Sequence, residues 1–151
     1  MIEGFHSHPN GGGLVENTAS VDITVFVGPD AKVTEKAIVK GNARVEGNAI
    51  VSGKSIVAGN ARISGKARIK GSARIFGNGT VTDLAIVYGN AQVFDNARVW
   101  GRARVGGSTR LFGESEHYDF PGLFDEPLLM GDFKEKDVLM GDVNETDNQT
   151  S

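Results

Sequence analysis

Three histidines and the arginines between them are the first candidates for chemistry. Two of the histidines lie near the N-terminus and the third is residue 117. His6 and His8 are one residue apart, so in an extended segment both imidazoles point the same way and two such rings can share a metal ion. The interpretation that we favour is that Phe5 and the two histidines form a polar cap before the turn "PNGGG". His6 and His8 are therefore candidate ligands only, and we predict neither a metal nor a cofactor.

The long middle of the chain lacks the most common general base. Residues 15–112 contain no histidine, and His117 follows them. The acidic residues Asp83 and Asp95 fall at turn positions, where they are expected to be exposed. We therefore assign no catalytic residue and favour a protein that is not an enzyme.

A six-residue sequence repeat determines how all of these residues are positioned. Branched aliphatic residues recur every six positions, and a small residue, mostly alanine, stands two residues before nearly every one. The alternation of small inward, polar outward and branched inward residues is typical of a short strand with one buried face. The series is Val15, Val21, Val27, Val33, Val39, Val45, Val51, Val57, Ile63, Ile69, Ile75, Val81, Val87, Val93, Val99, Val105 and Leu111.

Glycine follows most of these aliphatic residues two positions later and predicts a tight corner at the end of each phrase. Gly41, Gly47 and Gly53 begin the series, and Asp83 and Asp95 occupy two of its later places. Glycine reaches positive φ at no steric cost, and aspartate tolerates it better than most residues. A strand and a corner every six residues predict a solenoid, whereas a helix is opposed by both the period and the glycines.

A spacing of 18 residues predicts three strands in each coil. At this spacing Asn42, Asn60, Asn78 and Asn96 form one column, and Phe76, Phe94 and Phe112 form another. Like residues stack upon like in neighbouring coils of such a structure. We therefore predict an all-β, single-stranded parallel β-helix with an N-terminal cap at 1–14, the solenoid at 15–113 and an irregular acidic tail at 114–151, the end of which we expect to be disordered.

The Gly-Asn-Ala phrase, with "HPNGGG" and "VGPDAKV", resembles the hexapeptide-repeat proteins of the left-handed parallel β-helix (trimeric LpxA-like) superfamily. Within it the chain looks most like the YdcK-like, or acetyltransferase/carbonic anhydrase-like, group. The resemblance implies a left-handed solenoid and a homotrimer. Acyltransferases of the superfamily use a histidine base at a cleft between subunits, and its γ-class carbonic anhydrases hold zinc with three histidines. Neither set can be carried over, because residues 15–112 have none.

Arginines at the outward positions are the candidate binding residues. Arg44, Arg62 and Arg98 fall on one predicted face, interrupted by Thr80. Arg68 and Arg104 fall on a second face, and Arg74 and Arg110 on a third. Such columns suit a polyanion, but long stems that pack on the sheet, with their charges in water or paired with the acidic tail, explain them better. We favour this second explanation and do not expect nucleic acid to be a partner.

The third face also carries an apolar strip, which a solvated strand face seldom presents. Its members are Ile38, Ile56, Ala58, Phe76, Phe94 and Phe112. Either a homotrimer covers this strip, which we favour, or the tail folds back over it with residues such as Leu129 and Met130. Trp100 and Tyr88 fall on the other two faces near the same end and are further candidate binding residues.

Charge divides the chain into a basic body and an acidic tail. Residues 15–112 hold 14 Lys/Arg against 7 Asp/Glu, a net charge of +7, whereas residues 113–151 hold 2 against 11, a net charge of −9. The absence of cysteine, of a signal-like N-terminal segment and of a long apolar run leads us to expect a cytoplasmic protein that does not enter a membrane.

Two functions fit these observations. The first, which we favour, is a non-catalytic scaffold that recognises another macromolecule, such as a protein partner, through its flat faces and tail. The second is a hexapeptide-type acyltransferase or a binder of small anionic ligands, with sites between the subunits of a trimer. Arginine and asparagine columns would hold the anionic group in the second case.

Overall fold

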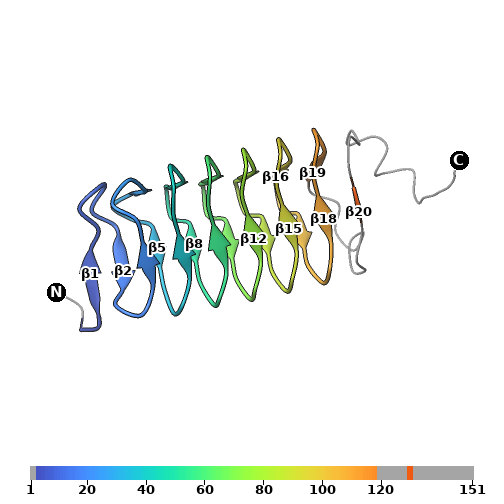
Figure 1. The fold of residues 1–151 in the computed structure, drawn as a ribbon. Helices are drawn as coiled ribbons and strands as arrows, with labels where there is room; N and C mark the ends of the chain where they lie inside the picture. Colours follow the sequence, from blue (N-terminus) through green and yellow to red (C-terminus); the bar gives the residue numbers. More distant parts are fainter. Residues whose placement is uncertain (1–2, 119–128, 131–151) are drawn as a thin grey trace, which may run out of the picture.

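The chain forms a parallel β-solenoid with three flat faces, as predicted from the 18-residue spacing (Figure 1). The computed structural model describes residues 3–118 and 129–130. From β2 onward successive strands lie on successive faces, so each strand from β2 to β16 pairs with the strand three places later. The coils stack side by side from the blue N-terminal end to the orange C-terminal end of Figure 1.

Each face is one sheet. Face A contains β1 (Phe5–Ser7), β2 (Leu14–Glu16), β5 (Lys32–Val33), β8 (Ile50–Val51), β11 (Arg68–Ile69), β14 (Ile86–Val87) and β17 (Arg104–Val105). Face B contains β3 (Ser20–Val21), β6 (Ile38–Val39), β9 (Ile56–Val57), β12 (Arg74–Ile75), β15 (Gln92–Val93), β18 (Arg110–Leu111) and β20 (Leu129–Met130). Face C contains β4 (Phe26–Val27), β7 (Arg44–Val45), β10 (Arg62–Ile63), β13 (Thr80–Val81), β16 (Arg98–Trp100) and β19 (Glu116–Tyr118).

The core is a column of aliphatic side chains along the axis of the solenoid. Ile63 pairs with Val45 on one side and with Val81 on the other, and all three are fully buried. Ala43 and Ala61, two residues before Val45 and Ile63, are buried too. Small and branched residues fill the narrow interior together, and burial of each branched side chain contributes about 1.5–3 kcal/mol. The predicted inward positions are thus confirmed.

Corners between the faces adopt the left-handed backbone conformation. Gly41, Gly47 and Gly53 have φ of 73°, 62° and 68°, and Asp83 and Asp95 adopt φ of 61° and 57°. The Asp83 carboxylate accepts the backbone N–H of Gly101 at 3.0 Å, and the Asp95 carboxylate accepts that of Gly113 at 3.0 Å. These hydrogen bonds tie each acidic corner to the next coil and offset the strain of a non-glycine residue.

Glu35 is a third acidic corner, which the sequence analysis did not identify. Its φ is 60°, and its carboxylate accepts the backbone N–H of Gly53 at 2.6 Å. The Glu35 N–H in turn donates to the carboxylate of Glu16 at 2.7 Å. The same arrangement therefore serves at three corners of the solenoid.

The N-terminal residues close the first coil. β1 runs antiparallel to β2, with His6 opposite Val15. The following loop lies along β4, because Val27 N–H donates to the Asn10 carbonyl and Gly13 N–H donates to the Val27 carbonyl, both at 3.0 Å. Gly13 has no space for a side chain, since a Cβ atom would lie 2.3 Å from the Gly28 carbonyl oxygen.

Parallel pairing continues beyond residue 113, where we expected the solenoid to end. β19 pairs with β16 and places His117 beside Val99 in the buried column. Our interpretation that His117 lies outside the repeat is therefore wrong, because His117 occupies the sixth position after Leu111. β20 pairs with β18 and extends face B by one strand. The rest of the predicted tail lies outside the described residues.

Candidate interaction faces

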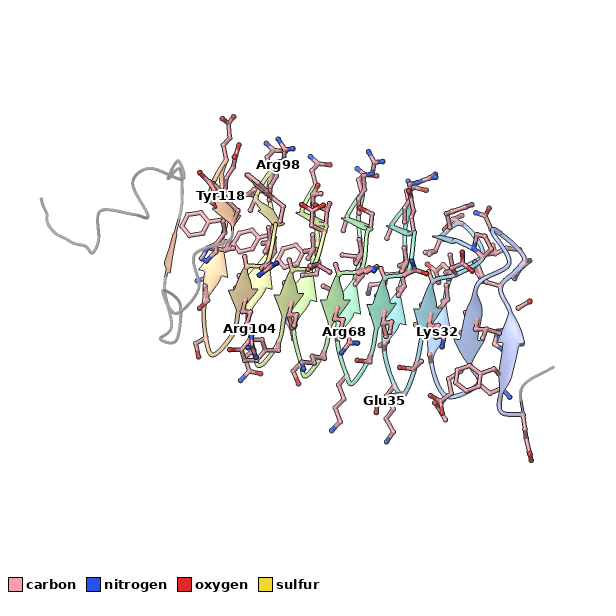
Figure 2. The ribbon with its side chains drawn as sticks, turned by 180° about the vertical axis from the view of Figure 1, so that it is seen from behind. Lys32, Glu35, Arg68, Arg98, Arg104 and Tyr118 are labelled. Atoms are coloured by element: carbon pink, nitrogen blue, oxygen red, sulfur yellow. The ribbon has the colours of Figure 1, made fainter. Side chains whose placement is uncertain are left out.

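Two outward positions in each strand segment carry the candidate site residues. The leading position immediately precedes the buried aliphatic residue, and the trailing position immediately follows it. Lys32, Arg68 and Arg104 are leading residues on face A and lie in one line along the solenoid (Figure 2). Arg98 belongs to face C, at the upper edge of the same view.

The arginine columns have the predicted registers. On face C, Arg44, Arg62, Thr80 and Arg98 are successive partners. On face B, Gln92 separates Arg74 from Arg110, and on face A, Ile86 separates Arg68 from Arg104. All seven arginines are exposed. Their role in binding stays a prediction, while their alignment is a property of the fold.

Aromatic rings form the predicted column at the trailing positions of face B. The ring centroids of Phe76 and Phe94 are 4.9 Å apart, and those of Phe94 and Phe112 are 5.6 Å apart. The Arg110 guanidinium lies 5.6 Å from the centre of the Phe94 ring. All three rings are half-buried. Face B therefore offers a continuous aromatic surface next to exposed positive charge.

Faces A and C also carry aromatic residues, in the same C-terminal coils as the aromatic column of face B. On face C, Trp100 stacks on Tyr118 with ring centroids 4.0 Å apart. On face A, the Tyr88 ring covers Gly106, where a Cβ atom would lie 2.2 Å from the ring, and Arg104 lies 5.9 Å from the ring centre. The Trp100–Tyr118 contact was not predicted, although the 18-residue spacing of the two rings indicates it.

Aromatic and acidic neighbours engage Arg44 near the other end of face C. Its guanidinium lies 4.6 Å from the centre of the Phe26 ring and also forms an ion pair with Glu46. Arg44 is thus held by two partners on its own face. Both interactions leave the side chain exposed, so each contributes little to stability.

The two N-terminal imidazoles occupy different environments. His6 is exposed and forms a hydrogen bond through Nδ1 with the side-chain oxygen of Asn17 at 2.7 Å. His8 is buried, and its Nε2 donates to the Val25 carbonyl at 2.7 Å. Among the described residues, no three His, Cys, Asp or Glu side chains are grouped as a metal site requires.

His117 is the one histidine within the described solenoid interior. It is buried beside Val99, and desolvation lowers its pKa to about 3. The imidazole is therefore neutral at physiological pH, because burial penalises the charged form.

Comparison with known proteins supports the repeat. Residues 91–107 match the family model described as the YdcK beta solenoid repeat. The matched stretch includes β15, β16 and β17 and contains two of the outward aromatic residues, Phe94 and Trp100. No curated protein and no solved structure matches the chain. Within the described residues there is no helix long and apolar enough to cross a membrane.

Proposed function

We propose that this β-solenoid with its YdcK-type repeat is a non-catalytic scaffold that binds another macromolecule through its flat faces. The observation that carries the proposal is the division of side chains between the two sides of each strand. Aliphatic residues fill the interior, whereas the arginines and the stacked aromatic rings of the last coils all point outward. Such residues are enriched at protein interfaces, where aromatic and arginine side chains contribute most of the binding energy.

Face B is proposed as the contact surface of a homotrimer. The half-buried trailing column of Phe76, Phe94 and Phe112 lies on the same sheet as Ile38 and Ile56, which are paired leading residues nearer the N-terminal end of face B. The resemblance to trimeric hexapeptide-repeat proteins supports the same assembly. A trimer formed in this way keeps faces A and C available for a protein partner.

A second function follows from one group of contacts on face B. Arg110 lies over Phe94, and the side-chain amide of Asn78 donates to that of Asn96 at 3.2 Å along the neighbouring corner. An anionic group such as a phosphate or carboxylate could bind there, between subunits. This alternative is a small-ligand binder or a hexapeptide-type acyltransferase.

Native mass spectrometry of protein purified without a metal-affinity step tests the two functions. One spectrum reports both the number of subunits and any retained mass. We expect a trimer whose mass equals that of three chains. A stoichiometric metal or small molecule retained in the trimer would contradict the scaffold and support the alternative function.

Substitution of Phe94 tests the proposed trimer interface. Phe94→Glu places a charge in the aromatic column and is expected to give a monomer, because a desolvated unpaired charge opposes association. Thr82→Glu is the matched control, since Thr82 is a half-buried trailing residue of the same coil on face C. A trimer that survives Phe94→Glu, or that dissociates equally with Thr82→Glu, would contradict the assignment of face B.

A further inference from the structure

Face A differs from the other two faces in the regular alternation of its leading residues. In the order of the stacked strands these residues are Leu14, Lys32, Ile50, Arg68, Ile86 and Arg104. Apolar and basic side chains therefore alternate over six consecutive coils. The corresponding residues on face C are Phe26, Arg44, Arg62, Thr80, Arg98 and Glu116, which do not alternate.

Burial follows the same alternation. Lys32, Arg68 and Arg104 are exposed, whereas Ile50 and Ile86 between them are half-buried. Lys32, Arg68 and Arg104 follow one another along this face in Figure 2, and their exposure places their charges in water. Face A thus presents apolar rows separated by rows of positive charge, which is the surface that an amphipathic partner with acidic residues complements.

The solenoid from residue 50 onward, taken over all three faces, is strongly basic. From residue 50 to residue 112 there are ten Lys/Arg and two Asp/Glu, a net charge of +8, which favours an acidic partner. The two acids are Asp83 and Asp95, whose carboxylates already accept backbone N–H groups. Exposed basic residues border face A on both sides: Lys36, Lys54, Lys66, Lys70 and Arg102.

The spacing of the rows identifies the shape of the partner. Neighbouring coils are about 4.8 Å apart, so like residues on face A recur every ~9.6 Å. Seven residues of an α-helix advance about 10.5 Å, which is close to this recurrence of ~9.6 Å, and residues four apart lie on the same side of the helix. Residues on one side of an extended strand recur every ~6.7 Å and do not match. The long stems of lysine and arginine absorb the small mismatch with the helix.

We propose that face A binds an amphipathic α-helix of a partner protein, aligned with the solenoid axis, in which acidic and apolar residues alternate turn by turn along one side. The acidic residues pair with Lys32, Arg68 and Arg104, and the apolar residues pack on Ile50 and Ile86. This inference rests on the proposed scaffold function and specifies its partner. A nucleic acid is bound best by an unbroken basic track with stacking platforms, whereas aliphatic rows interrupt the charges of face A.

Binding of designed peptides to the full-length protein tests the inference. The probe is a helical peptide of three heptads, with Glu at the first and Leu at the fifth position of each heptad, on a background of Ala and Gln. The control peptide has the same composition with Glu and Leu scrambled over all sides of the helix. We expect the patterned peptide to bind about tenfold more tightly than the scrambled peptide, as measured by fluorescence anisotropy.

Matched variants assign the binding to face A. Arg62, Arg68 and Arg74 are exposed leading residues of three successive strands, so Arg62→Glu and Arg74→Glu are controls for Arg68→Glu. We expect Arg68→Glu to weaken binding of the patterned peptide about tenfold and the two controls to weaken it less than about twofold. Ile86→Gln should also weaken it, and Thr80→Gln on face C should not. Gln92 occupies the equivalent position on face B, so the fold accommodates glutamine there.

Three results would overturn the inference. One is equal binding of the patterned and scrambled peptides, or no binding of either. Another is equal loss with Arg62→Glu and Arg68→Glu. The third is that polyglutamate or a single-stranded oligonucleotide binds as tightly as the patterned peptide, which would indicate general affinity for polyanions. The native mass spectrum of the same samples tests the scaffold separately, because retained small-molecule mass contradicts the scaffold whatever the peptides do.

Discussion

In β13, β14 and β15 the inward residues are all valines, whereas the outward leading residues are Thr80, Ile86 and Gln92. The interior accepts a narrow range of side chains because each residue lies between two similar residues in the adjacent coils, at the density of a protein core. The exterior has no such restriction. The inner side of each strand therefore specifies the fold, whereas the outer side is free to vary from coil to coil.

The largest test of this contrast is the same acidic substitution on opposite sides of β11. Ile69→Asp buries a carboxylate among aliphatic side chains and is expected to lower the free energy of unfolding by about 5 kcal/mol or more. Arg68→Asp changes an exposed residue and is expected to cost less than about 0.5 kcal/mol. Urea unfolding of the two variants measures the difference, and equal losses would refute the distinction.

The buried His117 provides a second test, because it places a titratable group in the aliphatic column. Its pKa is lowered from 6.5 to about 3, so between these values the unfolded state binds more protons than the folded state. The free energy of unfolding is therefore at its full value above about pH 6.5 and decreases as the pH falls towards 3. At pH 5 the expected loss is about 2 kcal/mol.

Trp100 offers a local readout of this loss, since it stacks on Tyr118 next to His117. Its fluorescence should change between about pH 6 and pH 4 as β19 separates from β16. His117→Val restores the aliphatic series and should abolish this change. A fluorescence transition that persists unchanged in His117→Val would show that another group controls the last coil.

A smaller effect is expected at the corners, where backbone conformation limits the choice of residue. Gly71 has φ of +67°, so Gly71→Ala should cost about 1–2 kcal/mol for the backbone conformation, with a further cost because its Cβ atom would lie 2.8 Å from the backbone nitrogen of Gly89. Gly71→Glu should cost about 1 kcal/mol less than alanine, because its carboxylate can accept the N–H of Gly89 as Glu35 accepts that of Gly53. Thermal unfolding compares the variants. An equal cost for both would show that the carboxylate does not stabilise this corner.

The smallest effect is expected along the exposed asparagine column. Asn78→Ala removes the hydrogen bond from Asn78 to Asn96 and should lower the free energy of unfolding by about 0.5–1 kcal/mol. Asn48→Ala changes an exposed asparagine at a different corner and serves as the control in urea unfolding. A loss above about 2 kcal/mol for Asn78→Ala would mean that this outer residue behaves like an interior one.

The sequence was sufficient to predict the features that repeat. Spacings of six and 18 residues predicted the buried Val and Ile column, the three faces and the Phe76–Phe94–Phe112 stack, because identical environments recur in every coil. His117 was missed because a polar residue at an aliphatic position breaks the pattern, and only pairing with β16 shows that it is buried. Glu35 was missed because glutamate seldom adopts positive φ, and its hydrogen bond to the next coil depends on three-dimensional contact.

The candidate faces were only partly predictable for a related reason. Columns on one face could be predicted from the 18-residue spacing, and the arginine registers agree with that prediction. The alternation of Ile and Arg along face A follows from the same spacing, but the exposure of the basic residues and the partial burial of Ile50 and Ile86 come from the structure.

The antiparallel strand β1 and the loop after it have a consequence for how copies of the chain meet. Stacked parallel strands present open edges at both ends of a solenoid, and such edges are templates for growth into fibres. At the N-terminal end β1 covers the edge of β2, and the loop at residues 8–13 bonds to the edge of β4. Because two of the three strand edges at this end are covered in this way, we expect head-to-tail polymerisation through this end to be disfavoured.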